Sequence, residues 1–340
     1  MKVMEYIVRS KFKFQSLAGR IVGVASILIL VVATVMASTP SASVDASKDL
    51  LSEGRVDDAI QSLQVEIDRP SATAESYNLL CRAYFMEDEW DRGIAACERA
   101  SALDPQKGDY YLWLGRVYGE KADHAGVFSA AGLAKKVRAN FERAVQLDPR
   151  NWEARTDLAE FYLEAPSIMG GGIDKARLQA DGIMPLNPAM AHWVQGRIAE
   201  KENDRGTAER EYRAALAASH NGARAWLDLA SFFRKAHRWK EMEQALANLE
   251  NGPVDRPEAL MDGAHLLLRT GRDFPLAERL LRRYLASPVE AGPAFKAHDM
   301  LGQLLEKQGD REAAASEYRS ALELAHGYSK AKENLQRVEH

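Results

Sequence analysis

One phrase recurs along the 340-residue chain, and it constrains the fold more than any other feature. Its copies share a helix-forming composition rich in small residues: CERASALDP (97–105), FERAVQLDP (141–149), EYRAALAAS (211–219) and EYRSALELA (317–325). A second apolar-periodic phrase precedes two of them, YNLLCRAYF (77–85) and YLWLGRVYG (111–119), so that Leu80 and Leu114 stand 34 residues apart. A period near 34 in a helical sequence predicts stacked helix pairs, because no pair can bury its apolar face alone.

The residues of these phrases indicate how neighbouring helices approach one another. Leu114 and Tyr118 are four residues apart, so they share one face of a helix and should pack inward. Gly115, beside Leu114, leaves room for a neighbouring helix. In the second helix of a pair we expect small residues to leave room for a neighbouring helix in the same way: Ala95, Ala208 and Ala314. Pro105 and Pro149 disfavour the helical conformation in the residue before them, so they should end these helices.

Composition favours a folded, all-helical body and argues against nucleic-acid binding. Hydrophobic residues make up 46% of the chain and charged residues 28%, both ordinary values for a soluble folded protein. The net charge is −4, but residues 1–37 hold five bases and one acid, which leaves 40 bases against 48 acids, a charge of −8, in the remainder. Domains that bind nucleic acid usually carry a basic surface. We therefore expect no nucleic-acid partner.

The N-terminus has the three-part pattern of an export signal. Basic residues come first, residues 21–36 carry no charge, and small residues follow at 37–47. Three interpretations remain open: a signal peptide cleaved after about Ala37, a membrane anchor formed by residues 21–37, and a buried core helix. The first two place residues 38–340 outside the cytoplasm, in the periplasm or at the outer face of a membrane, because the basic flank stays inside. We expect contact with the membrane only through this segment.

The repeated residues resemble the tetratricopeptide repeat family. The resemblance rests on a large residue, Leu, Gly and Tyr along the first helix, and on Ala, an aromatic residue, Ala and Asp-Pro along the second, and it covers roughly residues 74–328. It implies an all-α fold, a right-handed superhelical solenoid of antiparallel helix pairs. Residues 38–73 would hold a linker and a degenerate first repeat, and residues 329–340 a capping helix. After the first, units should begin near seven positions: Ala74, Gly108, Trp152, Ala189, Ala223, Pro257 and Phe295.

Three units are longer than the period, and in two of them the extra residues fall between the two helices of a pair. The excess lies in residues 119–136 and 164–172. Both insertions should project from the same edge of the solenoid at neighbouring units, where they could form a second contact edge. The second insertion ends in three glycines, but Ile-Asp-Lys follows where a phosphate-binding loop needs Gly-Lys-Ser/Thr, and Asp174 would repel an anion. We expect a flexible turn there.

The resemblance also implies a concave surface lined by the first helices, with ligand contacts at two positions per helix. Carried onto this chain, and with a basic residue near the same face included, the predicted protein- or peptide-binding residues are Asn78, Arg82, Leu112, Arg116, Trp193, Arg197, Arg224 and Leu227. Arginine binds carboxylates in a bidentate manner, so an acidic segment or a terminal carboxylate is the natural ligand. Alternatively, these arginines pair with neighbouring acids such as Glu75, Asp109 and Glu153 on a solvated face. The Lys/Asn clamp that some family members use is not reproduced.

Cys81 and Cys97 are the only cysteines, and they lie on the two helices of one pair at similar distances from the expected turn at 88–89. Facing side chains at one level can meet disulfide geometry, and export would supply the oxidising setting. The alternative is two buried thiols that act as small apolar residues. Without nearby paired histidines the two cysteines do not make a zinc site, and we expect no metal or cofactor.

No residue set indicates catalysis, because the chain has no Gly-x-Ser-x-Gly motif and neither insertion brings a nucleophile and a base together. The sequence predicts a non-catalytic interaction scaffold or adaptor outside the cytoplasm that binds a peptide in its concave groove. The alternative is an accessory protein of envelope assembly or polysaccharide export that binds a polymer. Aromatic groove residues would favour that alternative, and Trp193 is the only tryptophan among the predicted groove positions.

Overall fold

The computed structural model describes residues 40–287 and 293–340, and the regular elements in these ranges are all helices. The expected signal or anchor segment and the cleavage site at Ala37 lie outside the described residues. Among the described helices, none combines the length and the apolar character needed to cross a membrane. The all-α prediction is confirmed.

The helices form pairs, each with a first and a second member, and one terminal helix follows them. The first members are α1 (Pro40–Ser52), α3 (Ala74–Met86), α5 (Gly108–Asp123), α7 (Trp152–Glu164), α9 (Pro188–Lys201), α11 (Ala223–Lys235), α13 (Glu258–Thr270) and α15 (Ala294–Gln308). The second members are α2 (Val56–Ile67), α4 (Trp90–Leu103), α6 (Val127–Leu147), α8 (Ile173–Ile183), α10 (Arg205–Ala218), α12 (Trp239–Asn251), α14 (Phe274–Leu285) and α16 (Arg311–Leu324). The short 3-10 helix η1 (Ser167–Met169) precedes α8, and α17 (Ser329–Glu339) is the terminal helix.

Local sequence signals explain where the helices begin. α3, α5, α7 and α11 begin at the residue that the 34-residue period indicates, and α9, α13 and α15 begin within one residue of it. Several starts are capped by a side-chain oxygen that accepts a backbone N–H of the first turn: Thr73, Asn151, Asn187, Asp204, Asp273 and Asp310. α4 and α6 end at Leu103 and Leu147, two residues before a proline.

Most pairs reverse direction at a residue in the left-handed conformation, and the α13–α14 turn holds a second one, Asp273. These residues are Gly54, Asp88, Asn203, His237, Gly271 and Gly309. Glycine adopts this conformation without steric cost, and Asn and Asp tolerate it best among the other residues. The two pairs with insertions reverse differently. In the α5–α6 pair the extra residues lengthen both helices, whereas in the α7–α8 pair they form η1 and a turn at Gly170, whose φ is +94°.

The repeated phrase packs glycines of first helices against aromatic rings of second helices. A Cβ atom added at Gly115, Gly196 or Gly302 would lie 2.5, 2.8 or 2.5 Å from the ring of Phe141, Tyr212 or Tyr318. Ala208 and Ala314 are fully buried, as expected. The expectation for Ala95 is wrong because this residue is exposed, and Gly93 takes the inward position beside Val117.

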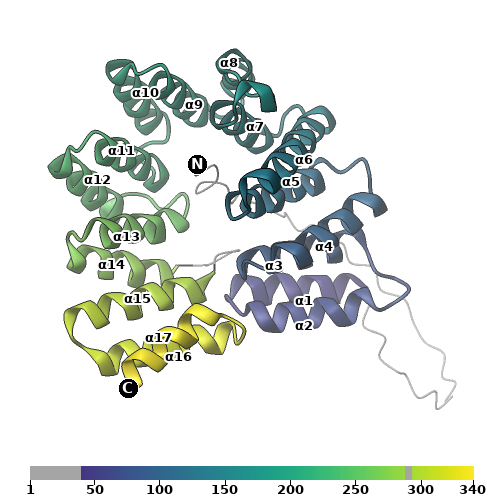
Figure 1. Cartoon of the computed structure of the whole chain (residues 1–340), viewed down its shortest axis with the longest axis vertical. Coiled ribbons are helices and arrows are strands. Elements are labelled where there is room, and N and C mark those ends of the chain that lie inside the picture. Colours follow the sequence, from purple (N-terminus) through teal and green to yellow (C-terminus); the bar gives the residue numbers. More distant parts are fainter. Residues whose placement is uncertain (1–39, 288–292) are drawn as a thin grey trace, which may run out of the picture.

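The helix pairs follow a closed circuit, with the first members on its inner side and the second members outside (Figure 1). The first and last units lie side by side although they are far apart in sequence. The backbone N and the Nδ1 of His326 each lie 2.5 Å from Oδ2 of Asp57, which is 269 residues away. Nζ of Lys296 lies 2.7 Å from Oδ1 of Asp88. The two ends of the repeat array are therefore in contact.

Candidate functional site

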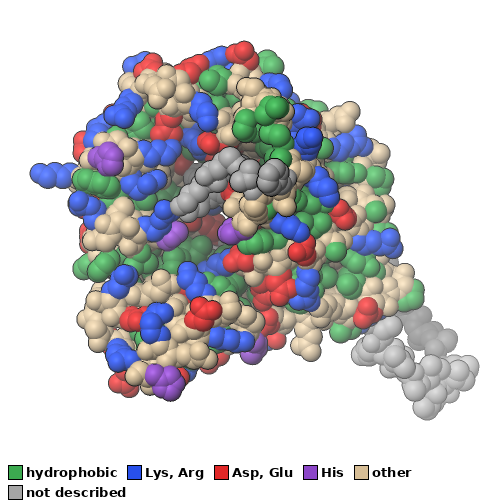
Figure 2. Space-filling model, viewed as in Figure 1, with side chains coloured by type: hydrophobic (Ala, Val, Ile, Leu, Met, Phe, Trp, Pro, Cys, Tyr) green, Lys and Arg blue, Asp and Glu red, His purple; other side chains and the backbone are tan. Residues whose placement is uncertain are grey.

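The inner surface is the candidate functional site, and its exposure differs from one predicted residue to the next. Five of the predicted binding residues are buried: Asn78, Leu112, Arg116, Trp193 and Leu227. The other three, Arg82, Arg197 and Arg224, are partly exposed. On the face drawn in Figure 2, basic and acidic side chains are interspersed rather than gathered by sign. The accessible chemistry of the inner surface therefore depends on which arginines already have carboxylate partners.

Arg116 on α5 forms ion pairs with carboxylates of the next unit. Its Nε donates to Oδ2 of Asp157 over 2.8 Å, and its Nη2 lies 3.4 Å from Oε2 of Glu153. The Arg116 side chain is only 3% exposed. Burial raises the pKa of Asp157 to about 7, although the charge of Arg116 acts in the opposite direction. This ion pair therefore ties α5 to α7.

Arg197 on α9 is likewise surrounded by carboxylates. Its Nη1 and Nη2 donate to Glu160 and Glu164 of α7, both over 2.7 Å, and its Nε lies 3.5 Å from Glu200. A hollow of about 300 Å³ opens beside Arg197, and the amine of Lys235 reaches Glu200 there over 2.7 Å. Arg197 thus already has carboxylate partners in this part of the inner surface.

Arg82 on α3 differs from Arg116 and Arg197. Its guanidinium carbon lies 4.9 Å from the centre of the Trp113 ring, and that of Arg116 lies 4.8 Å from the same ring. The ion pairs found among the described residues do not include Arg82. Burial, together with repulsion from Arg116, lowers the pKa of Arg82 to about 10. Arg82 therefore lacks the direct carboxylate partner that Arg116 and Arg197 have.

Two buried donors on α3 also lack partners. Nδ2 of Asn78 and Nε of Arg82 are inaccessible to solvent, and neither has a hydrogen-bond partner among the described residues. The two residues are one helical turn apart, so they share a face of α3. Both donors are thus unsatisfied within the described part of the chain.

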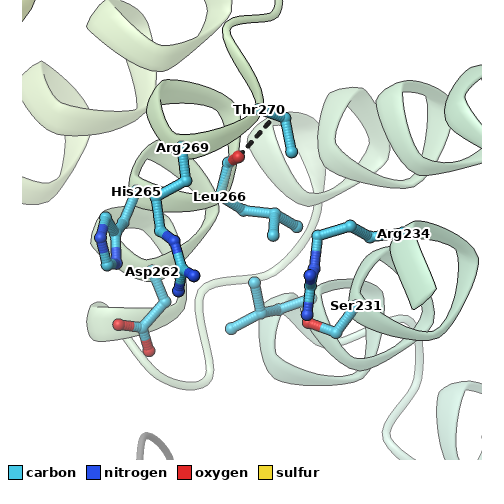
Figure 3. A pocket seen from close by; sticks show the side chains of 8 residues that line it. Ser231, Arg234, Asp262, His265, Leu266, Arg269 and Thr270 are labelled. Carbon is cyan, nitrogen blue, oxygen red and sulfur yellow. Dashed lines mark hydrogen bonds between the residues drawn. The ribbon is translucent and has the colours of Figure 1, made fainter.

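A second hollow on the inner surface lies between α11 and α13 and has a volume of about 180 Å³ (Figure 3). It combines an apolar part with polar and basic side chains: Leu227, Ser231, Arg234, Asp262, His265, Leu266, Arg269 and Thr270. Asp262 lies 3.6 Å from Nη2 of Arg256. Nε of Arg234 has no hydrogen-bond partner in the described part of the chain. The binding residues predicted from the sequence do not include Arg269 and Trp113, because the place of these two residues on the inner surface depends on contacts between units.

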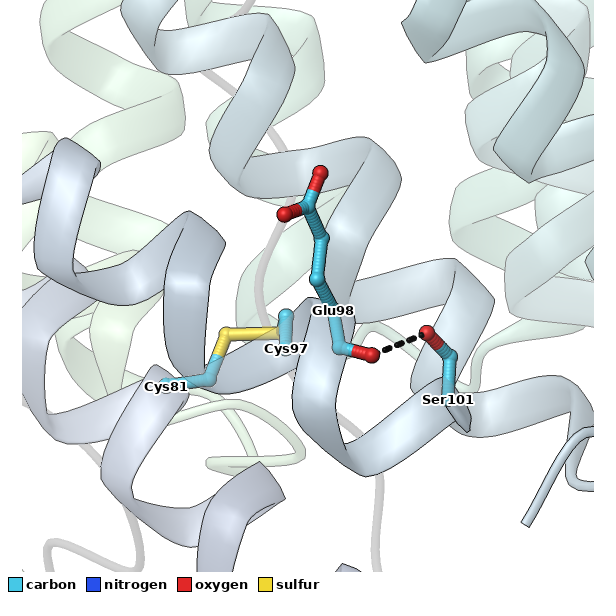
Figure 4. The surroundings of a disulfide bond; sticks show 4 residues. All are labelled: Cys81, Cys97, Glu98 and Ser101. Atoms are coloured by element: carbon cyan, nitrogen blue, oxygen red, sulfur yellow. Dashed lines mark hydrogen bonds between the residues drawn. A yellow bond between two sulfur atoms is a disulfide. The ribbon is translucent and has the colours of Figure 1, made fainter. Parts of the chain in front are cut away.

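The cysteine pair lies next to the Arg82 region. Cys81 on α3 and Cys97 on α4 form a disulfide with a Cα–Cα distance of 5.2 Å, and both residues are fully buried (Figure 4). Ser101 donates to the carbonyl of Glu98 over 3.0 Å, one turn further along α4. The covalent link fixes α3, which carries Asn78 and Arg82, to its partner helix.

The described residues hold no group of three or more His, Cys, Asp or Glu side chains suited to a metal ion. Helix pairs stacked around an inner surface define an α-solenoid of helical repeats. Residues 261–329 match the family model described as tetratricopeptide repeat. Residues 261–329 are thus identified as tetratricopeptide repeat sequence. This class indicates a scaffold for protein–protein interaction with protein or peptide partners, and such repeats are generally non-catalytic.

Solved structures of tetratricopeptide repeat proteins resemble the chain at low sequence identity. A thermophilic protein of this class from Thermus thermophilus is 15% identical, with a TM-score of 0.48, over 57% of this chain and 99% of that one. One from Parabacteroides merdae is 13% identical, with a TM-score of 0.44, over 88% and 99%. YrrB, described as having an unusual peptide-binding site, is 18% identical, with a TM-score of 0.40, over 53% and 86%. A comparison with curated proteins gives no match.

Proposed function

We propose that this protein is an interaction scaffold outside the cytoplasm, and that Asn78 and Arg82 bind a carboxylate of a peptide or protein partner. The observation that carries the proposal is the pair of buried donors without partners on α3. A buried donor that is left unsatisfied costs about 1–3 kcal/mol, and more when it is charged. A carboxylate can accept from both donors and neutralise the guanidinium, so binding would recover this cost.

The surroundings of Arg82 favour an anionic ligand over a cationic or apolar one. Arg82 and Arg116 both lie over the ring of Trp113, so two positive charges are close together. The carboxylates of Asp109 and Glu153 attract Arg82 electrostatically but do not form an ion pair with it. An extended partner that is bound at Arg82 could also contact the hollow beside Arg234, which would provide a second basic contact on the inner surface.

Two observations support a location outside the cytoplasm. Residues 1–37 have the pattern of an export signal or anchor, with a charge-free stretch at 21–36. The disulfide between Cys81 and Cys97 would persist in an oxidising compartment. The two features come from different parts of the chain, and both support a location outside the cytoplasm.

The alternative of a polymer-binding accessory protein receives less support. Sugar rings stack on open aromatic faces, but Trp193 is only 2% exposed. Its ring is covered in part by the guanidinium groups of Arg197 and Arg224, which lie 5.4 and 5.7 Å from its centre. We therefore favour the peptide-binding proposal.

The test is substitution of Arg82 by methionine in the full chain, which carries a C-terminal tag and is used to capture partners from envelope extract. We expect Arg82→Met to lose a partner that the wild type retains. We also expect its free energy of unfolding to stay equal or to rise, because an apolar side chain of similar length replaces a buried charge without a counter-ion. Both quantities are measured, by mass spectrometry of the captured proteins and by chemical denaturation.

The matched control is Arg210→Met on α10, where an exposed arginine donates only to Thr207. This variant should keep the partner. Retention of every partner by Arg82→Met would contradict the proposal. A fall of several kcal/mol in its unfolding free energy would instead make Arg82 a structural residue.

A further inference from the structure

The contact that closes the circuit of helices differs from the other contacts between units. We call it the seam, and it consists of Gly54, Asp57, Asp88, Ala294, Lys296 and His326. Adjacent units elsewhere pack helix against helix. At the seam, by contrast, turns and helix ends meet. One side consists of the α1–α2 turn, the start of α2 and the α3–α4 turn. The other side consists of the start of α15 and the α16–α17 turn.

The interactions across the seam are few, and most are polar. Lys296 pairs with Asp88 over 2.7 Å, and the Asp88 side chain is 48% exposed. His326, whose side chain is 76% exposed, meets the carboxylate of Asp57. Ion pairs at exposed positions contribute little and are screened by salt. In the described part of the chain, the seam thus lacks the helix-on-helix packing that joins the other units.

The two sides also approach too closely for any side chain at Gly54. Its φ is +76°, and an added Cβ atom would lie 2.7 Å from Cβ of Ala294. This distance is well below van der Waals contact, so the seam closes only around a glycine at this position. The contact between Gly54 and Ala294 is therefore sterically specific, although it covers only a small area.

We propose that the seam is a reversible intrachain contact, and that its opening admits a partner to the inner surface from the side. In the closed form the first and last units join, and the inner surface is encircled. In the open form the units part as rigid ends of the solenoid, while the packing within each unit remains. This inference does not depend on which ligand Arg82 binds, because the seam can be tested in the protein alone.

The test measures the distance across the seam by double electron–electron resonance between spin labels at Glu53→Cys and Ser329→Cys. Both positions are exposed and lie on opposite sides of the seam. We expect a narrow, short distance in the otherwise unchanged protein. The population with this distance should fall in about 1 M NaCl, where charges are screened within about 3 Å, and should return when the salt is removed.

The variant Gly54→Gln should lose the short distance, because the new side chain has no space beside Ala294. Gly271→Gln is the matched control. Gly271 also lies in a left-handed turn, with φ +65°, but an added Cβ meets nothing within 4 Å. Both variants carry the same backbone strain, so circular dichroism should show equal helicity, and only the seam variant should change the distance.

Three results would overturn the proposal. The first is a short distance that persists in Gly54→Gln or disappears equally in Gly271→Gln. The second is a distance that salt does not change or changes irreversibly. The third is a short distance that is lost on dilution with unlabelled protein, because it would then join two copies of the chain rather than two ends of one.

Discussion

Gly302 shows how the repeated phrase acts at the scale of single residues. The position has no side chain because the ring of Tyr318 occupies the space that a Cβ atom would take. Tyr318 is fully buried, and its hydroxyl donates to Glu306 over 3.0 Å, so the ring cannot move aside without losing a hydrogen bond. The same glycine–aromatic contact recurs at Gly115 and Gly196.

We expect Gly302→Ala to lower the free energy of unfolding by about 1–3 kcal/mol, the usual cost of overpacking a core. Gly132→Ala in α6 is the comparison, because an added Cβ there meets nothing within 4 Å. It should stabilise the protein by about 0.4–1 kcal/mol, since alanine restricts the unfolded chain more than glycine does. Chemical denaturation of both variants measures the difference. Equal effects would show that the Tyr318 contact does not limit this position.

At the scale of elements, the disulfide joins two helices that already pack against each other. Reduction of Cys81–Cys97 should lower the free energy of unfolding by about 3 kcal/mol, the value for a closed loop of about 15 residues. Denaturation with and without a thiol reductant measures the change. The double variant Cys81→Ala/Cys97→Ala should not respond to the reductant. A wild-type protein equally insensitive to it would contradict the expected stabilisation.

Much of the element order could be predicted from the sequence, because helix starts depend on local signals and on the period. α3, α5 and α7 begin where the repeated phrases indicate. The site could be predicted only in part. The partner of Arg116 is Asp157, 41 residues away on the next first helix, and the rotation of one helix against the next decides whether these side chains meet. No local pattern encodes that rotation, so arginines with and without carboxylate partners look alike in the sequence.

At the scale of the whole molecule, closure of the circuit is a sum of many small rotations. Each unit turns slightly against its neighbour, and the last unit meets the first only if these turns add up correctly. The lengthened hairpin α5–α6 and the glycine turn before α8 meet along the way, where Nη1 of Arg138 donates to the carbonyl of Met169 over 3.3 Å. The seam therefore depends on units that do not contribute residues to it.

Rising pH should lower the free energy of unfolding, because burial near the seam favours the protonated form of the Glu87 carboxyl group. Burial raises the pKa of Glu87 to about 8, with help from its hydrogen bond to Asp57, the charge of Asp57 and that of Glu89, while Arg92 acts in the opposite direction. Burial opposes ionisation of Asp57, but hydrogen bonds from His326 and Glu87 lower its pKa. Asp57 is thus the charged member of this pair.

The direction of the pH dependence follows from the number of protons that each form binds. In the unfolded chain Glu87 would titrate near its ordinary pKa of 4.5, so between that value and about 8 the folded form binds more protons. The stabilisation is complete below about 4.5 and is lost as the pH rises through 8. We expect the free energy of unfolding, measured by chemical denaturation, to fall as the pH rises from about 4.5 to 8, and Glu87→Gln to make this fall smaller. An equal fall in Glu87→Gln would assign the pH response to other groups.

The closed circuit gives the molecule a topological property that an open groove does not have. A ligand on an open groove leaves when its contacts break. A polypeptide that passes through a closed circuit is topologically linked to it. It leaves only when one of its ends slips through or when the circuit opens at the seam. The residence time of the bound polypeptide would then depend on the size of its ends rather than on its affinity. A weakly bound polypeptide with a folded domain on each side could slide through the circuit and still remain associated with it.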